Sequence, residues 1–124
     1  MIGRKNRFHG YGSLKYVYKN GRTVRGPLFA VKSVANNKRD SYRLAVVVSR
    51  KVNKSAVVRN RIRRRLYEGV GALGAEILSP ADIVLTVYND AVKEEPWNNL
   101  NKQLRKQFEE AELITKKSKL EREN

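Results

Sequence analysis

A run of five arginines within the seven residues 59–65 constrains this chain more than any other feature of its sequence. Apolar residues recur every four positions through this run and beyond it: Val58, Ile62, Leu66 and Val70. An α-helix turns about 100° per residue, so these four side chains form one stripe, and Asn60, Arg61 and Arg64 project away from it. The pattern predicts a helix that buries one edge in a core and presents guanidinium groups to solvent. Guanidinium groups bind phosphate through paired hydrogen bonds, which favours a polyanionic partner.

Positive charge is concentrated in the first half of the chain. Residues 1–65 carry 19 Lys/Arg and one acid, Asp40, for a net charge of +18, whereas residues 66–124 carry 8 Lys/Arg and 11 acids, for a net of −3. Like charges as dense as those of 59–65 repel one another by around 1 kcal/mol per close exposed pair. Such a helix is retained only where an anion compensates the repulsion. Nucleic acid is the partner that this charge distribution favours.

Composition excludes several other classes of protein. No apolar run approaches the roughly 18 residues that a membrane span needs, and no amphipathic segment with a large continuous apolar face accompanies the basic one, so we expect no membrane partner. The chain has no cysteine, which excludes disulfides and thiolate metal sites and fits a reducing cytosol. The basic N-terminus is not followed by an apolar stretch, so no signal peptide is expected. These observations together predict a cytoplasmic protein.

Hydrophobic periodicity predicts a single α+β domain over residues 1–114. We expect a short helix over 14–19, capped by Ser13 and closed in the left-handed manner at Asn20-Gly21. Strand patterns and further helices follow in order: strands over 28–34 and 42–49, an arginine-rich helix from the cap Ser55 to about Val70, a strand over 82–88, and a last helix opened by Pro96 with the stripe Trp97, Leu100, Leu104, Phe108 and Ala111. Residues 115–124 form a charged tail that we expect to fray.

Several ordered blocks resemble one family, the protein subunit of bacterial ribonuclease P. The segment Arg59-Asn60-Arg61-Ile62-Arg63-Arg64 resembles the RNR signature of that family. Other blocks that resemble it stand in the same order around this segment: Arg7-Phe8, residues 21–29, Ser49-Arg50-Lys51-Val52 with Ala56-Val57-Val58, and residues 80–84. The resemblance covers roughly residues 7–110. An arginine-rich helix alone is weak support, but four ordered blocks around it are specific.

The resemblance implies a fold and a function. The fold would be an α/β sandwich with a small mixed sheet, in the order α-β-β-β-α-β-α, and a left-handed βαβ crossover through the arginine-rich helix. The protein would bind the catalytic ribonuclease P RNA and the 5′ leader of precursor tRNA, with no obligatory protein partner. The RNA would cut the leader from precursor tRNA using magnesium that the RNA and substrate mainly hold, so no protein side chain is expected to be catalytic.

Motif positions also imply site residues. The RNA-binding set comprises Arg59, Asn60, Arg61 and Arg64 of the helix, Arg63 and Arg65 as helpers, and Arg50, Lys51 and Lys54 of the preceding loop. A second set would line a cleft for the single-stranded leader: Leu14, Tyr18 and Lys32. Aromatic rings stack on unpaired bases while cations follow the backbone, but Leu14 cannot stack. The alternative is that Leu14 and Tyr18 are ordinary core residues.

Three other functions are alternatives to this one. A metal-dependent nuclease needs carboxylates that converge on magnesium, but residues 1–65 offer only Asp40, and Asp82 and Asp90 lie far apart along an extended segment. A histidine-based ribonuclease needs a second acid or base, and His9 is the sole histidine. A small ribosomal or ribosome-assembly protein fits the charge and size equally well; only the ordered blocks favour the ribonuclease P subunit.

Overall fold

Three helices and four strands follow one another in the order that the family resemblance implied. The computed structural model describes residues 6–8 and 11–115. The helices are α1 (Tyr11–Asn20), α2 (Ala56–Leu73) and α3 (Trp97–Glu110), and the strands are β1 (Arg22–Arg25), β2 (Phe29–Ala35), β3 (Arg43–Val48) and β4 (Ala81–Val87). Two short 3-10 helices, η2 (Gly74–Glu76) and η3 (Asp90–Lys93), flank β4. The fold class is therefore α+β, as predicted.

The four strands form one mixed sheet in the order β1-β2-β4-β3. β2 pairs antiparallel with both β1 and β4, whereas β3 pairs parallel with β4. A parallel pair needs a crossover connection, and α2 supplies it between β3 and β4. The handedness that the resemblance implies for this crossover stays a prediction.

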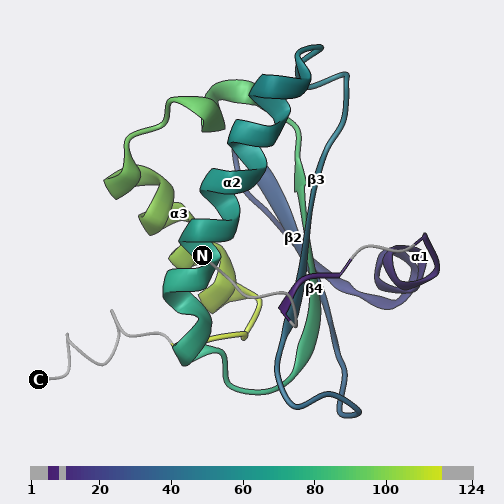
Figure 1. Ribbon diagram of the computed structural model, residues 1–124. Helices are drawn as coiled ribbons and strands as arrows, with labels where there is room; N and C mark the ends of the chain where they lie inside the picture. Colours follow the sequence, from purple (N-terminus) through teal and green to yellow (C-terminus); the bar gives the residue numbers. More distant parts are fainter. Residues whose placement is uncertain (1–5, 9–10, 116–124) are drawn as a thin grey trace, which may run out of the picture.

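Helices cover both faces of the sheet, and two hydrophobic clusters result. Figure 1 shows α2 and α3 on one face and α1 on the other. The larger cluster lies under α2 and α3, and the smaller one, beneath α1, consists of Phe8, Val17, Ala45 and Val84 with Leu14, Val34 and Val47 packed against it. This arrangement separates the arginine-rich helix from α1 by the thickness of the sheet.

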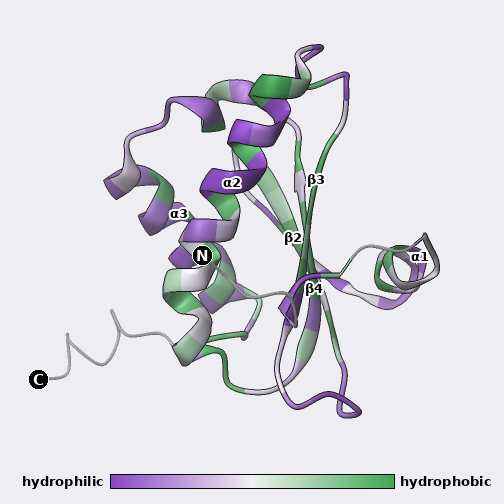
Figure 2. Ribbon diagram, in the orientation of Figure 1, coloured by the Kyte–Doolittle hydropathy of each residue, from purple (hydrophilic) through white to green (hydrophobic). Residues whose placement is uncertain are grey.

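The predicted stripe holds α2 against the sheet. Ile62, Leu66 and Val70 are fully buried, and each contributes roughly 1.5–3 kcal/mol relative to exposure. Figure 2 shows hydrophilic and hydrophobic bands alternating along the helix. The Ser55 side chain accepts a hydrogen bond from the Val58 amide at 3.3 Å, which confirms the predicted cap. The helix runs three residues past Val70 because Leu73 continues the buried stripe.

Both predicted ends of α1 are wrong. The helix begins at Tyr11, so Ser13 lies within it and is not its cap. Gly21 does not adopt the left-handed conformation. Its amide instead donates to the Val17 carbonyl at 2.7 Å, and a Cβ at this position would lie 2.5 Å from the same oxygen. Glycine is required here by close approach and not by a positive φ.

β3 lies at the edge of the sheet but is covered on both faces, as its uninterrupted apolar sequence predicted. Leu44 is fully buried and Ala45 nearly so. Residues 6–8 run along the open edge of this strand, where the Phe8 amide donates to the Leu44 carbonyl at 3.1 Å. The edge is thereby partly protected from pairing with another chain.

A buried ion pair joins β3 to β4 on the α1 side of the sheet. The Arg43 guanidinium donates to both oxygens of Asp82, each at 2.8 Å, and the Asn36 amide donates to Oδ2 at 3.0 Å. Burial alone would raise the pKa of Asp82, but hydrogen bonds from Arg43 and Asn36, with the charge of Arg43, outweigh it and lower this pKa. The lowered pKa means that ionised Asp82 stabilises the fold.

We expect the free energy of unfolding of Asp82→Asn to depend less on pH at acidic pH than that of the wild type. The contribution of Asp82 is complete above its unfolded pKa, about 3.9, and is lost as the pH falls through the lower folded pKa. The variant should unfold more easily at neutral pH, by about 1–3 kcal/mol, yet lose less stability below about pH 4. Urea unfolding at a series of pH values measures this effect. Asp40→Asn, at an exposed carboxylate, is the control, and profiles that stay parallel for wild type and Asp82→Asn would contradict the assignment.

Candidate nucleic-acid interface

The outer face of α2 presents two guanidinium groups without partners. Asn60, Arg61 and Arg64 are exposed, as the stripe predicted. Within residues 6–8 and 11–115, the side chains of Arg61 and Arg64 make no hydrogen bond or ion pair. Arg63 is half-buried and donates to the Asn60 Oδ1 at 3.1 Å. Arg61 and Arg64 are therefore the helix residues that are free to bind phosphate.

Arg59 fastens the preceding loop to α2. Its Nη1 donates to the backbone carbonyls of Asn53 and Lys54 at 3.0 and 2.9 Å. Asn53 is fixed in turn, since its Oδ1 accepts from the Ser55 amide at 2.9 Å and its Nδ2 donates to Asp90 at 3.2 Å. Part of the Arg59 guanidinium is thus committed to the shape of the loop.

Arg65 points away from the outer face and joins α2 to the segment after β4. Its Nη1 donates to the Val92 carbonyl, and its Nη2 donates to the Glu95 carbonyl at 2.5 Å. The guanidinium also lies 4.6 Å from the centre of the Trp97 ring, which makes a cation–π contact. Burial, followed by the charge of Arg61, lowers the pKa of Arg65. Trp97 itself is 41% exposed, so its predicted place in the core stripe of the last helix is wrong.

The loop before α2 gathers the three predicted loop cations around one hollow. Arg50, Lys51 and Lys54 line a depression of ≈ 420 Å³. The N-terminus of α2 adjoins this loop and adds the positive end of a helix dipole. The structure therefore brings the loop cations together beside the arginine-rich helix.

A second hollow lies on the other face of the sheet, beside α1. Leu14, Lys15, Tyr18 and Val47 line this space of ≈ 390 Å³, which we call the Tyr18 hollow. The Tyr18 ring is 41% exposed, and the Lys32 ammonium lies 5.7 Å from its centre. Leu14 is half-buried and packs on the smaller cluster. All three residues predicted for a leader cleft thus lie together, with Tyr18 open to solvent and Leu14 partly committed to packing.

Residues that the sequence analysis did not select extend this surface. The Thr86 hydroxyl lies 3.5 Å from the Tyr18 hydroxyl. Thr23 pairs with Lys32 in the sheet register, so Arg25, two residues further along, lies on the same face. The Arg25 guanidinium is 6.0 Å from the centre of the Tyr88 ring, which is 44% exposed. The alternation of side chains along β4 could have identified Thr86, because it places Val84 and Thr86 on the same face of the sheet.

Carboxylates do not converge anywhere in the described part of the chain. No group of three or more His, Asp or Glu side chains that could hold a metal occurs among residues 6–8 and 11–115. Asp82 is bound by Arg43, and Asp90 by Lys93 and Asn53. Each of these two carboxylates therefore already has a partner in the described structure. His9 and residues 116–124 lie outside the described residues. No helix of the described ranges has the length and hydropathy to cross a bilayer.

Free guanidinium groups on one face of a small mixed sheet and an aromatic hollow on the other are what a small α+β RNA-binding protein would present. The chain belongs to the ribonuclease P protein family, because the family model described as Ribonuclease P matches residues 2–112. The family predicted from the sequence is confirmed.

Curated relatives and solved structures agree with this assignment. The ribonuclease P protein component of Pseudanabaena sp. (strain PCC 6903) is 32% identical over 93 residues, covering 75% of this chain and 80% of the relative. That of Thermoanaerobacter sp. (strain X514) is 37% identical over 92 residues, covering 74% and 77%. A Staphylococcus aureus RNase P protein mutant with defective mRNA degradation activity superposes with a TM-score of 0.79 at 26% identity, covering 90% and 92%. The Thermotoga maritima RNase P protein, at 22% identity and a TM-score of 0.71, covers 81% and 92% and shares the fold.

Proposed function

We propose that this protein is the subunit of a ribonucleoprotein in which α2 binds the catalytic ribonuclease P RNA and the Tyr18 hollow binds the 5′ leader of precursor tRNA. The two surfaces lie on opposite faces of the sheet (Figure 1), so the protein can contact both RNA molecules at once. No obligatory protein partner enters this proposal, and we place the activity in the cytoplasm.

The observation that carries the proposal is the pairing of the exposed Tyr18 ring, which lines the Tyr18 hollow, with a nearby cation. Tyr18 and Lys32, 5.7 Å apart, offer a stacking surface for an unpaired base and a charge for the adjoining phosphate. A double-stranded RNA cannot use such a ring, because its bases are already stacked and paired. The hollow therefore suits the single-stranded leader.

Hydrolysis is assigned to the RNA in this proposal. Magnesium held mainly by the RNA and the substrate would supply the metal ions that activate water and stabilise the leaving oxygen. The protein's residues raise the affinity for the substrate and neutralise phosphates, which lowers the magnesium concentration that the complex needs. Reconstitution with a ribonuclease P RNA at low magnesium tests this division of labour. We expect cleavage only with the RNA present and faster cleavage when the protein is added; cleavage by the protein alone would refute the proposal.

Replacing Tyr18 with alanine should weaken the binding of precursor tRNA more than the binding of mature tRNA. Stacking on an aromatic ring is worth about 1–3 kcal/mol per base, so the affinity of the reconstituted complex for precursor should fall about fivefold or more, whereas mature tRNA has no leader to lose. Tyr18→Phe is the matched control, because it keeps the ring and removes only the hydroxyl near Thr86. Equal losses for both tRNAs would return Tyr18 to a packing role.

A further inference from the structure

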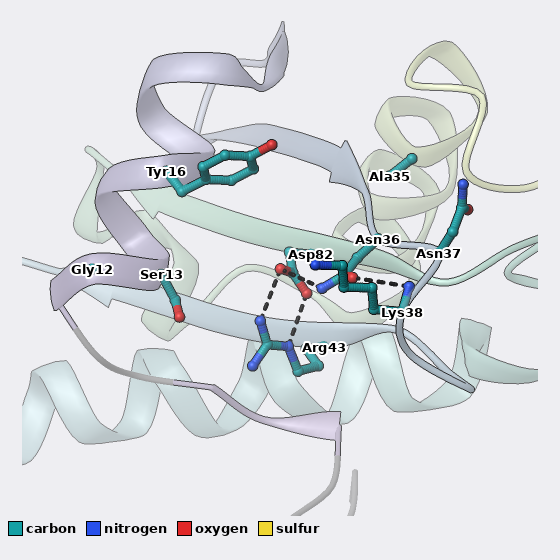
Figure 3. A pocket seen from close by; sticks show the side chains of 9 residues that line it. All are labelled: Gly12, Ser13, Tyr16, Ala35, Asn36, Asn37, Lys38, Arg43 and Asp82. Atoms are coloured by element: carbon teal, nitrogen blue, oxygen red, sulfur yellow. Dashed lines mark hydrogen bonds and ion pairs between the residues drawn. The ribbon is translucent and has the colours of Figure 1, made fainter.

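A third hollow lies on the opposite flank of α1 from the Tyr18 hollow. Its volume is ≈ 540 Å³, and we call it the Tyr16 hollow. The residues that surround it come from α1, the end of β2 with the turn that follows it, β3 and β4, as Figure 3 shows: Gly12, Ser13, Tyr16, Ala35, Asn36, Asn37, Lys38, Arg43 and Asp82. Tyr16 and Tyr18 are two residues apart, so the helix directs their rings to different flanks.

The floor of the Tyr16 hollow is rigid and electrically balanced. Arg43 and Asn36 point toward Asp82 (Figure 3), and together they supply the three hydrogen bonds to its carboxylate. The Asn36 Oδ1 accepts in turn from the Lys38 amide at 3.3 Å. The Asp82 charge is therefore compensated and does not repel an anionic ligand, and the turn that carries the next two residues is held in place.

The walls of the hollow carry groups that remain available to a ligand. The Tyr16 ring is 57% exposed, the largest exposed fraction of any aromatic side chain reported for the described residues. Asn37 and Lys38 are both exposed. Neither side chain makes a hydrogen bond or ion pair within the described ranges. An aromatic face, an amide with both donor and acceptor, and an ammonium group are the three kinds of contact that an unpaired nucleotide uses.

We infer that the Tyr16 hollow binds one nucleotide of single-stranded RNA. The base stacks on the Tyr16 ring, the Asn37 amide contacts the base edge, and the Lys38 ammonium pairs with the phosphate. This inference rests on the proposed function, which brings single-stranded RNA to the neighbouring flank of α1. The strand has two possible sources: leader nucleotides beyond those in the Tyr18 hollow, or an unpaired segment of the RNA subunit.

The test compares Tyr16→Ala with Tyr16→Phe in the complex reconstituted with ribonuclease P RNA. Affinity is measured for precursor tRNAs with a long, a short and no leader, and separately for assembly of the protein with the RNA subunit. We expect Tyr16→Ala to weaken one of these affinities about fivefold or more, and Tyr16→Phe to retain it because the ring remains. Thermal unfolding of the free proteins checks that this exposed substitution leaves the fold intact.

Each outcome is decisive. A loss confined to the long leader assigns the strand to the distal leader, and a loss in assembly that is independent of the leader assigns it to the RNA subunit. Unchanged affinities for Tyr16→Ala, or an equal loss for Tyr16→Phe, would overturn the inference. Tyr18→Ala and the wild-type protein are measured in parallel. If the wild type shows no preference for leader-bearing substrate, the proposed function is refuted. If the wild type shows this preference and Tyr16→Ala changes no affinity, only the inference about the Tyr16 hollow is refuted.

Discussion

Replacing Arg61 and Arg64 together with alanine should weaken assembly with the RNA subunit roughly 10- to 100-fold at moderate salt. Both guanidinium groups are exposed and free of partners in the described structure, so the substitution removes charge from the proposed RNA-binding face without disturbing the core. Unlike Arg59 and Arg65, neither residue bonds to a backbone carbonyl. The effect should therefore appear in RNA affinity and not in the stability of the free protein.

The salt dependence of binding gives a sharper reading than affinity alone. Each phosphate contact that is lost removes roughly 0.7–0.9 from the slope of log affinity against log salt. The double variant should therefore lower this slope by roughly 1.4–1.8, which a titration over several salt concentrations measures. Lys102→Ala with Lys106→Ala, at two exposed lysines of α3, is the control because it removes the same charge elsewhere. An unchanged slope for the Arg61 and Arg64 variant, or an equal change for the lysine variant, would mean that the RNA phosphates do not bind specifically at Arg61 and Arg64.

Removing the Arg65 side chain should destabilise the free protein by about 2–4 kcal/mol. The substitution Arg65→Ala leaves the carbonyls of Val92 and Glu95 without their donor, and hydrogen bonds from a charged group are worth about 1.5–3 kcal/mol each. It also removes the contact with the Trp97 ring, which is worth about 0.5–2 kcal/mol. Because these carbonyls are partly solvated, the total loss of stability is smaller than the sum of the individual contact energies.

Urea unfolding of Arg65→Ala beside Arg64→Ala measures this difference. The neighbouring Arg64 is exposed, so its loss should change the free energy of unfolding by less than about 0.5 kcal/mol. Arg65→Lys keeps the charge but cannot reach both carbonyls in the same fork, so we expect an intermediate loss. Equal stabilities for Arg64→Ala and Arg65→Ala would show that the Arg65 contacts do not hold the segment after β4.

Local sequence signals predicted the arginine-rich helix well. Its cap at Ser55 and its four-residue apolar repeat both depend on neighbours within one or two turns, and the structure confirms both. The exposed positions of Asn60, Arg61 and Arg64 follow from the same periodicity. β2, β3 and β4 were predicted to within one residue at each end, because alternation and uninterrupted apolar runs are also local, whereas no strand was predicted for β1.

Roles that depend on distant backbone atoms were not predictable in this way. Arg65 was expected to assist RNA binding, yet its guanidinium bonds to carbonyls 27 and 30 residues further along the chain. A carbonyl carries no side-chain signature, so no sequence pattern marks it as a partner. The Tyr16 hollow was missed for a related reason, since its walls meet only when four separate segments fold together.

The unequal size of the two hydrophobic clusters affects which helix detaches from the sheet more easily. α1 is anchored through the smaller cluster, chiefly by Val17 against Ala45 and Val84, so it detaches from the sheet at a lower free-energy cost than α2, whose stripe enters the larger one. Because α1 carries Tyr16 and Tyr18, the proposed binding of RNA beside it would hold in place a helix that is less firmly attached than α2. On the proposed function, binding of RNA at this site and rigidity of α1 would be thermodynamically linked, each increasing the other.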